Sequence, residues 1–150
     1  MSPHEKTAWW GLVSAILIWL FLLMRFTEAG RIVDLPAGYA LATYVQMIVL
    51  WIVASVVPAM FAAKHPQQTG KDERDRAIDA LGDRWQGYVV VIAINALVVH
   101  ALARAMYVDR IPSVPIPDLG STTALIFALL TTLFLADAVK QAVVLWQYRR

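Results

Sequence analysis

The sequence contains no cysteine, few charged residues and no recognisable catalytic motif, and each absence excludes a class of chemistry. Without cysteine, the chain of 150 residues forms no disulfide and offers neither a thiolate nucleophile nor a cysteine ligand for a metal ion. It also lacks a glycine-rich phosphate loop, a His-Glu-x-x-His zinc motif and the nucleophile elbow of hydrolases. We therefore predict that the protein is not an enzyme and carries no cofactor and no metal ion.

Charged residues make up only 16% of the chain, whereas hydrophobic residues make up 59%. The charged residues are placed so that four long apolar stretches lie between them. A helix of roughly 20 apolar residues crosses a hydrocarbon core about 30 Å thick. Inside lipid every peptide group must be satisfied within its own segment, which favours helices. The sequence therefore predicts an all-α integral membrane four-helix bundle. Residues 1–150 form its single transmembrane domain, with spans at about residues 8–27, 37–63, 84–107 and 120–147.

The distribution of basic residues predicts the orientation. If the N-terminus is cytosolic, the cytosolic segments hold eight basic residues and the two outer loops hold four. An excess of Lys and Arg marks the cytosolic side of a membrane protein. Both termini and the connector between the second and third spans are therefore predicted to be cytosolic. Because the basic residues are scattered over the loops, no nucleic-acid partner is predicted.

The connector before the third span is the most highly charged segment. We expect a helix to start near Lys71, so that residues 71–84 form a cytosolic helical connector. Its acids recur at steps of three and four residues and therefore share one helical face, where they are expected to be exposed. The predicted partner-binding residues are Asp72, Glu73, Arg74, Asp75, Arg76, Asp79 and Asp83. Two alternatives remain open, namely a solvated extension stabilised by local ion pairs and a divalent cation on the acidic face.

A short motif in this segment reads D-E-R-x3-I-x3-G-x-R-x3-Y, from Asp72 through Ile78 and Gly82 to Tyr88. The motif resembles a family of small bacterial inner-membrane proteins of unknown function with about four spans. This resemblance implies a multi-pass protein of the bacterial inner (cytoplasmic) membrane and no particular activity. Gly82 would allow close approach of a neighbouring helix. Arg84 and Tyr88 are predicted to anchor the third helix at the membrane interface.

Polar residues within the spans form a second candidate site. Counted inward from Trp85, Trp146 and Lys64, several lie at about one depth near the midplane. The predicted intramembrane polar cluster comprises Ser55, Asn95, Asp137, Lys140 and Gln141. A charge at that depth costs a few kcal/mol and should face the bundle interior. We therefore predict Asp137 within hydrogen-bonding reach of Lys140, Asn95 or both.

These observations leave two hypotheses from different classes. The first is a non-enzymatic inner-membrane accessory or regulatory subunit that presents the charged cytosolic helix to another membrane or cytosolic protein. The alternative is a small homodimeric transporter coupled to protons or ions through Asp137 and Lys140. A lysine one turn from the acid lowers the pKa of that acid, which suits proton exchange poorly. We therefore favour the first hypothesis; in either case the lipid bilayer is a partner.

Overall fold

The computed structural model of the protein describes residues 3–28, 31–63, 72–107 and 119–150, and four long helices dominate them. They are α1 (Pro3–Phe26), α2 (Ala37–Ala63), α3 (Glu73–Tyr107) and α4 (Thr122–Tyr148). Two strands of two residues each, β1 (Thr27–Glu28) and β2 (Arg31–Ile32), pair antiparallel after α1. All four helices are long and apolar enough to cross a membrane, which confirms the all-helical prediction. The short hairpin was not predicted.

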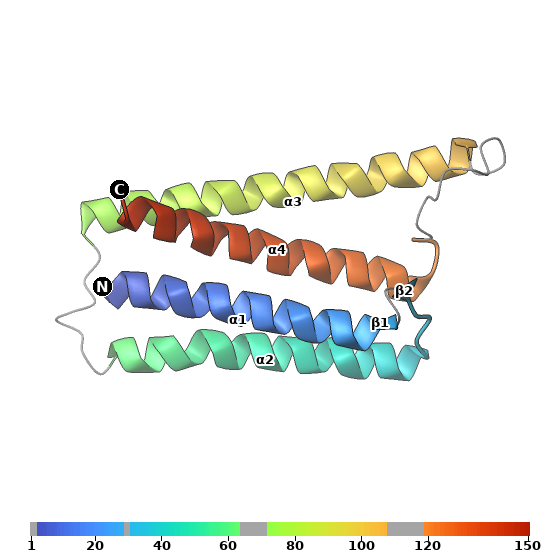
Figure 1. The fold of residues 1–150 in the computed structure, drawn as a ribbon, viewed down its shortest axis with the longest axis horizontal. Helices are drawn as coiled ribbons and strands as arrows, with labels where there is room; N and C mark the ends of the chain where they lie inside the picture. The colour runs from blue at the N-terminus through green and yellow to red at the C-terminus, as the bar shows by residue number, and fades with distance from the viewer. Residues whose placement is uncertain (1–2, 29–30, 64–71, 108–118) are drawn as a thin grey trace.

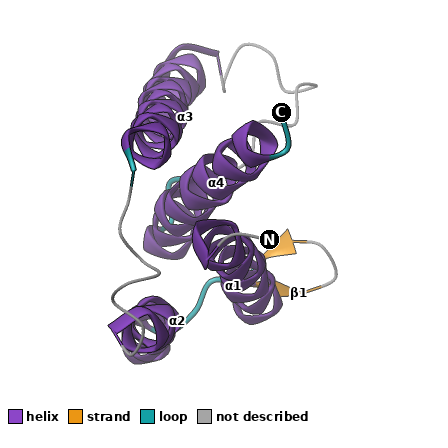
Figure 2. Ribbon diagram, turned by 90° about the vertical axis from the view of Figure 1, so that its left-hand side faces the viewer, coloured by secondary structure: helices purple, strands orange, loops and turns teal. Residues whose placement is uncertain are grey.

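The helices run alternately up and down, so that both ends of the chain lie at one end of the molecule (Figure 1). The start of α3 and the end of α2 lie at this same end, called here the terminal end. Viewed along the bundle, the helices follow the order α2, α1, α4, α3 (Figure 2). The bundle is therefore open, because α3 packs mainly against α4 and not against α2.

Two apolar clusters hold the helices together. The larger one joins α1, α2 and α4 through Ile18, Leu22, Phe26, Met47, Leu130 and Phe134. The smaller one lies nearer the terminal end and joins α1, α3 and α4 through Ala8, Ile78, Val144 and Leu145. Because α3 contributes only Ile78 to these clusters, its contact with α4 is centred near its first turns.

Most of the outer surface of the helices is apolar. Exposed large hydrophobic side chains occur on all four helices, and none of the residues in the most apolar window of α3 is buried. A water-soluble protein rarely exposes so much apolar surface, whereas hydrocarbon solvates it without cost. This distribution is the one expected of a multi-pass membrane protein.

Helix α3 is too long to lie wholly within a bilayer. Its 35 residues extend about 52 Å, compared with a hydrocarbon core of about 30 Å. The stretch from Trp85 to Ala103 has no charged residue, and Arg84 and Arg104 flank it. The apolar part of α3 therefore covers residues 85–103, and its first three turns extend beyond it at the terminal end.

Candidate functional site

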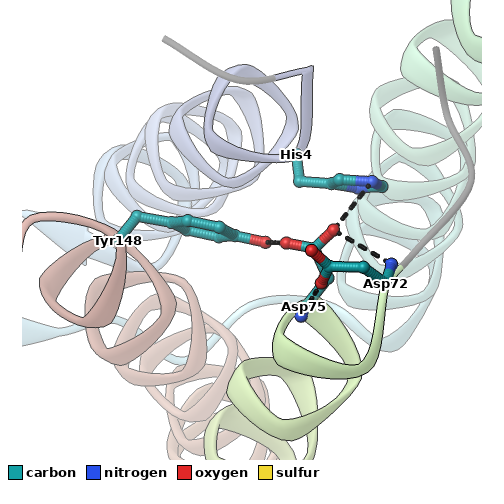
Figure 3. Close-up of polar contacts among 4 residues, drawn as sticks. All are labelled: His4, Asp72, Asp75 and Tyr148. Carbon is teal, nitrogen blue, oxygen red and sulfur yellow. Dashed lines mark hydrogen bonds and ion pairs between the residues drawn. The ribbon is translucent and has the colours of Figure 1, made fainter.

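The first turn of α3 forms a polar junction with the ends of two other helices (Figure 3). The Tyr148 hydroxyl, at the end of α4, donates a hydrogen bond of 2.6 Å to Oδ1 of Asp75. The Nε2 atom of His4, on the first turn of α1, lies 3.5 Å from Oδ2 of Asp75, where it forms an ion pair when protonated. One carboxylate thus connects α1, α3 and α4.

Asp75 also completes the cap of its own helix. Its backbone N–H donates to Oδ1 of Asp72 at 2.7 Å, and the Asp72 N–H lies 3.4 Å from Oδ2 of Asp75. This reciprocal arrangement is a capping box in which Asp75 takes the usual place of glutamate. It satisfies two N–H groups that an α-helix leaves free at its start and fixes where α3 begins.

The hydrogen bonds at this junction change the pKa of Asp75, on the first turn of α3, and of Tyr148, the last residue of α4. The hydrogen bond from Tyr148 is the main cause that lowers the pKa of Asp75, and the backbone N–H of Asp72, which donates to its carboxylate, and the nearby His4 act in the same direction. Burial raises the pKa of Tyr148, and its hydrogen bond to the Asp75 carboxylate raises it further. At neutral pH the junction therefore holds an ionised acceptor and a protonated donor.

A glycine allows α3 to approach α4 closely. A methyl group added at Gly82 would lie 2.8 Å from Cγ2 of Val144 and 3.4 Å from the backbone oxygen of Lys140. The face of α3 that meets α4 carries Asp75, Ile78 and Gly82, which are spaced three and four residues apart, and Ile78 is buried there. The predicted role of Gly82 in helix approach is confirmed. Beside this contact, Nζ of Lys140 lies 2.5 Å from Oδ1 of Asp83, and the two side chains form an ion pair.

The two faces of the connector helix therefore differ in what they contact. The predicted partner-binding residues that lie exposed are Asp72, Glu73, Arg74, Arg76 and Asp83. Asp75 and Asp79 are half-buried, and the side chain of Asp75 is 15% exposed. The prediction that the whole acidic face is exposed was wrong, because helical periodicity does not reveal which residues meet a neighbouring helix. The interface residues Arg84 and Tyr88 are both exposed.

A shallow groove of about 330 Å³ runs along the junction between the start of α3 and the end of α4. Its lining combines two arginines and a glutamine with three apolar side chains: Arg74, Arg150, Gln147, Ala77, Ile78 and Leu81. The apolar side chains suit an apolar residue of a ligand, and the guanidinium groups suit a carboxylate or phosphate. Within the described part of the chain, no group of three or more His, Asp or Glu side chains could hold a metal ion.

The predicted intramembrane cluster does not form as one site. Lys140 pairs with Asp83, and Asn95 donates to the carbonyl of Val91 in its own helix at 2.8 Å. Asp137 instead lies 3.5 Å from the side-chain nitrogen of Gln141. The prediction that Asp137 hydrogen-bonds Lys140 or Asn95 was therefore wrong among the described residues, although the charge of Lys140 still acts on Asp137.

The register between helices explains this error. The prediction assumed that Trp85 and Trp146 lie at one depth, but Gly82 of α3 packs between Lys140 and Val144 of α4. Lys140 and, one turn away, Asp137 therefore lie near the interfacial end of the apolar region. Ser55 lies near this level too, because its neighbour Ala54 accepts a hydrogen bond from Trp10, close to the Gly11 contact with Gln141. Asn95, thirteen residues after Gly82, lies about 20 Å away.

Neither His4 nor Tyr148 was predicted to be a site residue. The alternating topology predicted for the four helices contained the necessary signal. It brings the start of α1, the start of α3 and the end of α4 to one side of the membrane, where the polar residues of the three ends can meet. What the topology could not supply is which acid of the connector faces the other two helices.

In comparisons with known proteins, no protein-family model, no curated protein and no solved structure matches this chain. The resemblance of the segment from Asp72 to Tyr88 to a family of bacterial membrane proteins therefore stays a prediction.

Proposed function

We propose that the protein is a non-enzymatic membrane subunit that uses the terminal end of α3 and α4 to bind another protein. The observation that carries this proposal is the groove lined by Arg74 and Arg150, which lies on surface outside the apolar part of the helices. The junction at Asp75 holds the walls of this groove together, because it joins the first turn of α3 to the last residue of α4. We propose that the bound segment of the partner carries an apolar side chain next to an acidic one.

The pairing of acids within the chain supports this choice of partner charge. Asp75 is bound by Tyr148, and Asp83 is paired with Lys140. The acidic groups at this end are therefore partly used in holding the helices together. A partner that supplies carboxylates complements Arg74 and Arg150, whose guanidinium carbon lies 5.0 Å from the centre of the Trp146 ring, and such charge complementarity selects one partner over others.

Charge reversal at the groove tests the proposal. Arg74→Glu with Arg150→Glu is expected to abolish co-purification of a stoichiometric partner from native membranes in mild detergent. The thermal stability of the protein itself should hardly change, since exposed substitutions usually alter stability by less than about 0.5 kcal/mol. Arg31→Glu, an exposed arginine at the opposite end of the molecule, is the control and should leave the partner bound. Equal partner yield from both variants would contradict the proposal.

The transporter hypothesis requires Asp137 and Lys140 to act as one site. In the structure Lys140 pairs with Asp83 of α3, and Asp137 contacts Gln141. No contact in the described residues therefore favours the transporter over the binding subunit.

We further propose that the chain lies in the bacterial inner membrane with its terminal end in the cytosol, as the excess of basic residues indicates. Because the chain has no cysteine, single cysteines can report on this orientation. Glu73→Cys and Glu28→Cys form a matched pair, since both glutamates are exposed and lie at opposite ends of the molecule. In intact spheroplasts a membrane-impermeant thiol reagent is expected to label Glu28→Cys and not Glu73→Cys. The reverse pattern would overturn the orientation.

A further inference from the structure

One face of α3 has no neighbour in the described chain and repeats at the spacing of a coiled coil. Exposed residues recur at steps of three and four along it: Tyr88, Val91, Asn95, Val98, Leu102 and Ala105. This spacing is the heptad pattern of a left-handed helix pair, whose seam residues recur every 3.5 positions. Because α4 packs near Ile78 and Gly82, on the other side of the helix, the face is directed away from the rest of the bundle.

Asn95 is the residue that shows that this face does not simply meet lipid. It lies at the middle of the uncharged stretch of α3, eleven residues after Arg84 and nine before Arg104. One N–H group of its amide donates to the Val91 carbonyl. An asparagine amide also has a second N–H group and a carbonyl oxygen. Lipid tails offer no hydrogen-bond partner for them, and an unsatisfied polar group in hydrocarbon is costly.

The exposed Ser55 on α2 differs from Asn95 in this respect. Its hydroxyl donates to the carbonyl of Trp51 at 2.8 Å, which satisfies its one donor within its own helix. It also lies nearer the end of the apolar region than Asn95 does, as the contact of the neighbouring Ala54 with Trp10 indicates. The exposed face of α3, unlike that of α2, therefore carries amide groups near the middle of the membrane whose hydrogen bonds only another protein can supply.

We propose that α3 forms a parallel homodimer in which Asn95 of each copy hydrogen-bonds Asn95 of the other. An amide is self-complementary, because it has both a donor and an acceptor. Two copies of one chain insert with the same orientation, so that a twofold axis through the seam brings the two amides to the same depth. A single asparagine in an apolar seam fixes register and favours a two-stranded pair in coiled coils. The seam includes no residue of the groove, so this proposal is independent of the proposed function.

Disulfide formation between single cysteines tests the seam. Val98→Cys lies on the proposed seam, and Val99→Cys, at the next position and nearly the same depth, lies beside it. The two valines are 52% and 63% exposed, so accessibility alone would favour the second. In the full chain reconstituted in phosphatidylcholine vesicles, mild oxidation is expected to cross-link Val98→Cys at least about tenfold faster than Val99→Cys. Equal rates, or faster reaction of Val99→Cys, would overturn the proposal.

The role of Asn95 has its own measurement. Asn95→Leu should fold, because it places an apolar side chain on an exposed apolar face. It is expected to weaken dimerisation about three- to tenfold, measured by energy transfer between labelled copies as the ratio of lipid to protein is raised; interhelical polar contacts in membranes have effects of this size. Asn95→Gln, which keeps the amide, should lose less than Asn95→Leu. An unchanged or stronger dimer for Asn95→Leu, or a monomeric wild-type chain at every lipid ratio, would overturn the proposal.

Discussion

Replacing Gly82 with leucine is expected to lower the free energy of unfolding by about 2–3 kcal/mol, as overpacking of a tight contact does. The reason is that even a methyl group at Gly82 would lie 2.8 Å from Cγ2 of Val144, and the nearby backbone oxygen of Lys140 cannot move aside. The helices α3 and α4 would have to separate at their main contact. The measurement is unfolding of the purified protein by SDS titration in mixed micelles.

Gly87, five residues further along the same helix, provides the matched control. A methyl group added there would meet nothing within 4 Å, so that Gly87→Leu should leave stability unchanged or raise it slightly. Comparable losses from both variants would show that the helix tolerates leucine poorly in general and that Gly82 is not a special contact. We expect the ion pair between Asp83 and Lys140 to be lost in Gly82→Leu only.

Replacing Asp75 with alanine is expected to lower the free energy of unfolding by about 2–3 kcal/mol. The change removes the hydrogen bond that Tyr148 donates to a charged acceptor, which contributes about 1.5–3 kcal/mol, and the contact of the Asp75 carboxylate with the Asp72 N–H, whereas Asp72 still caps the helix. Glu73→Ala is the control, because Glu73 is exposed on the same turn. Exposed changes of this kind usually alter stability by less than about 0.5 kcal/mol. Equal effects would contradict a structural role for Asp75.

The same junction predicts a dependence of stability on pH. The pKa of Asp75 in the folded protein is below its usual value of 3.8, mainly because of the hydrogen bond from Tyr148. Ionised Asp75 therefore contributes stability at neutral pH, and this contribution is lost as the pH falls below 3.8 through the lowered pKa. Tyr148→Phe should make the free energy of unfolding less dependent on pH in this acidic range. Glu73→Ala is the control and should keep the pH dependence of the wild type. An identical acid profile for Tyr148→Phe and the wild type would contradict the assignment.

Several features of the fold could be predicted from the sequence because they depend on local pattern. Apolar stretches of the required length predict helices whatever their packing partners are. The reason is that backbone N–H and C=O groups in lipid must form their hydrogen bonds within their own segment. The helix expected near Lys71 begins at Glu73 and continues without interruption to Tyr107. Gly82 could be recognised as a contact because a residue without a side chain in an otherwise bulky helix indicates close approach.

The identity of polar partners, in contrast, depends on the register between helices. Lys140 could reach either Asp137 on its own helix or an acid on another helix. Only the packing of Gly82 against α4 brings Asp83 to 2.5 Å from its amine. Tryptophans gave a misleading depth scale, because Trp85 and Trp146 do not lie level with each other in the packed helices. Relative to an alignment that sets Trp85 level with Trp146, α3 and α4 are shifted by about two turns, or about 11 Å. This shift places Lys140 in an interfacial ion pair and not in a cluster near the midplane.

The sequence by itself determined the number of apolar helices, their alternating direction and the segment that carries most of the charge, because these follow from hydropathy and length. Only the tertiary structure decided which face of that segment is structural. Asp75 and Asp79 share a helical face with exposed acids, yet Asp75 meets His4 and Tyr148 from two other helices. Periodicity specifies that residues lie on one face, but rotation of the helix about its axis is set by packing against neighbours, here by the fit of Ile78 and Gly82 against α4.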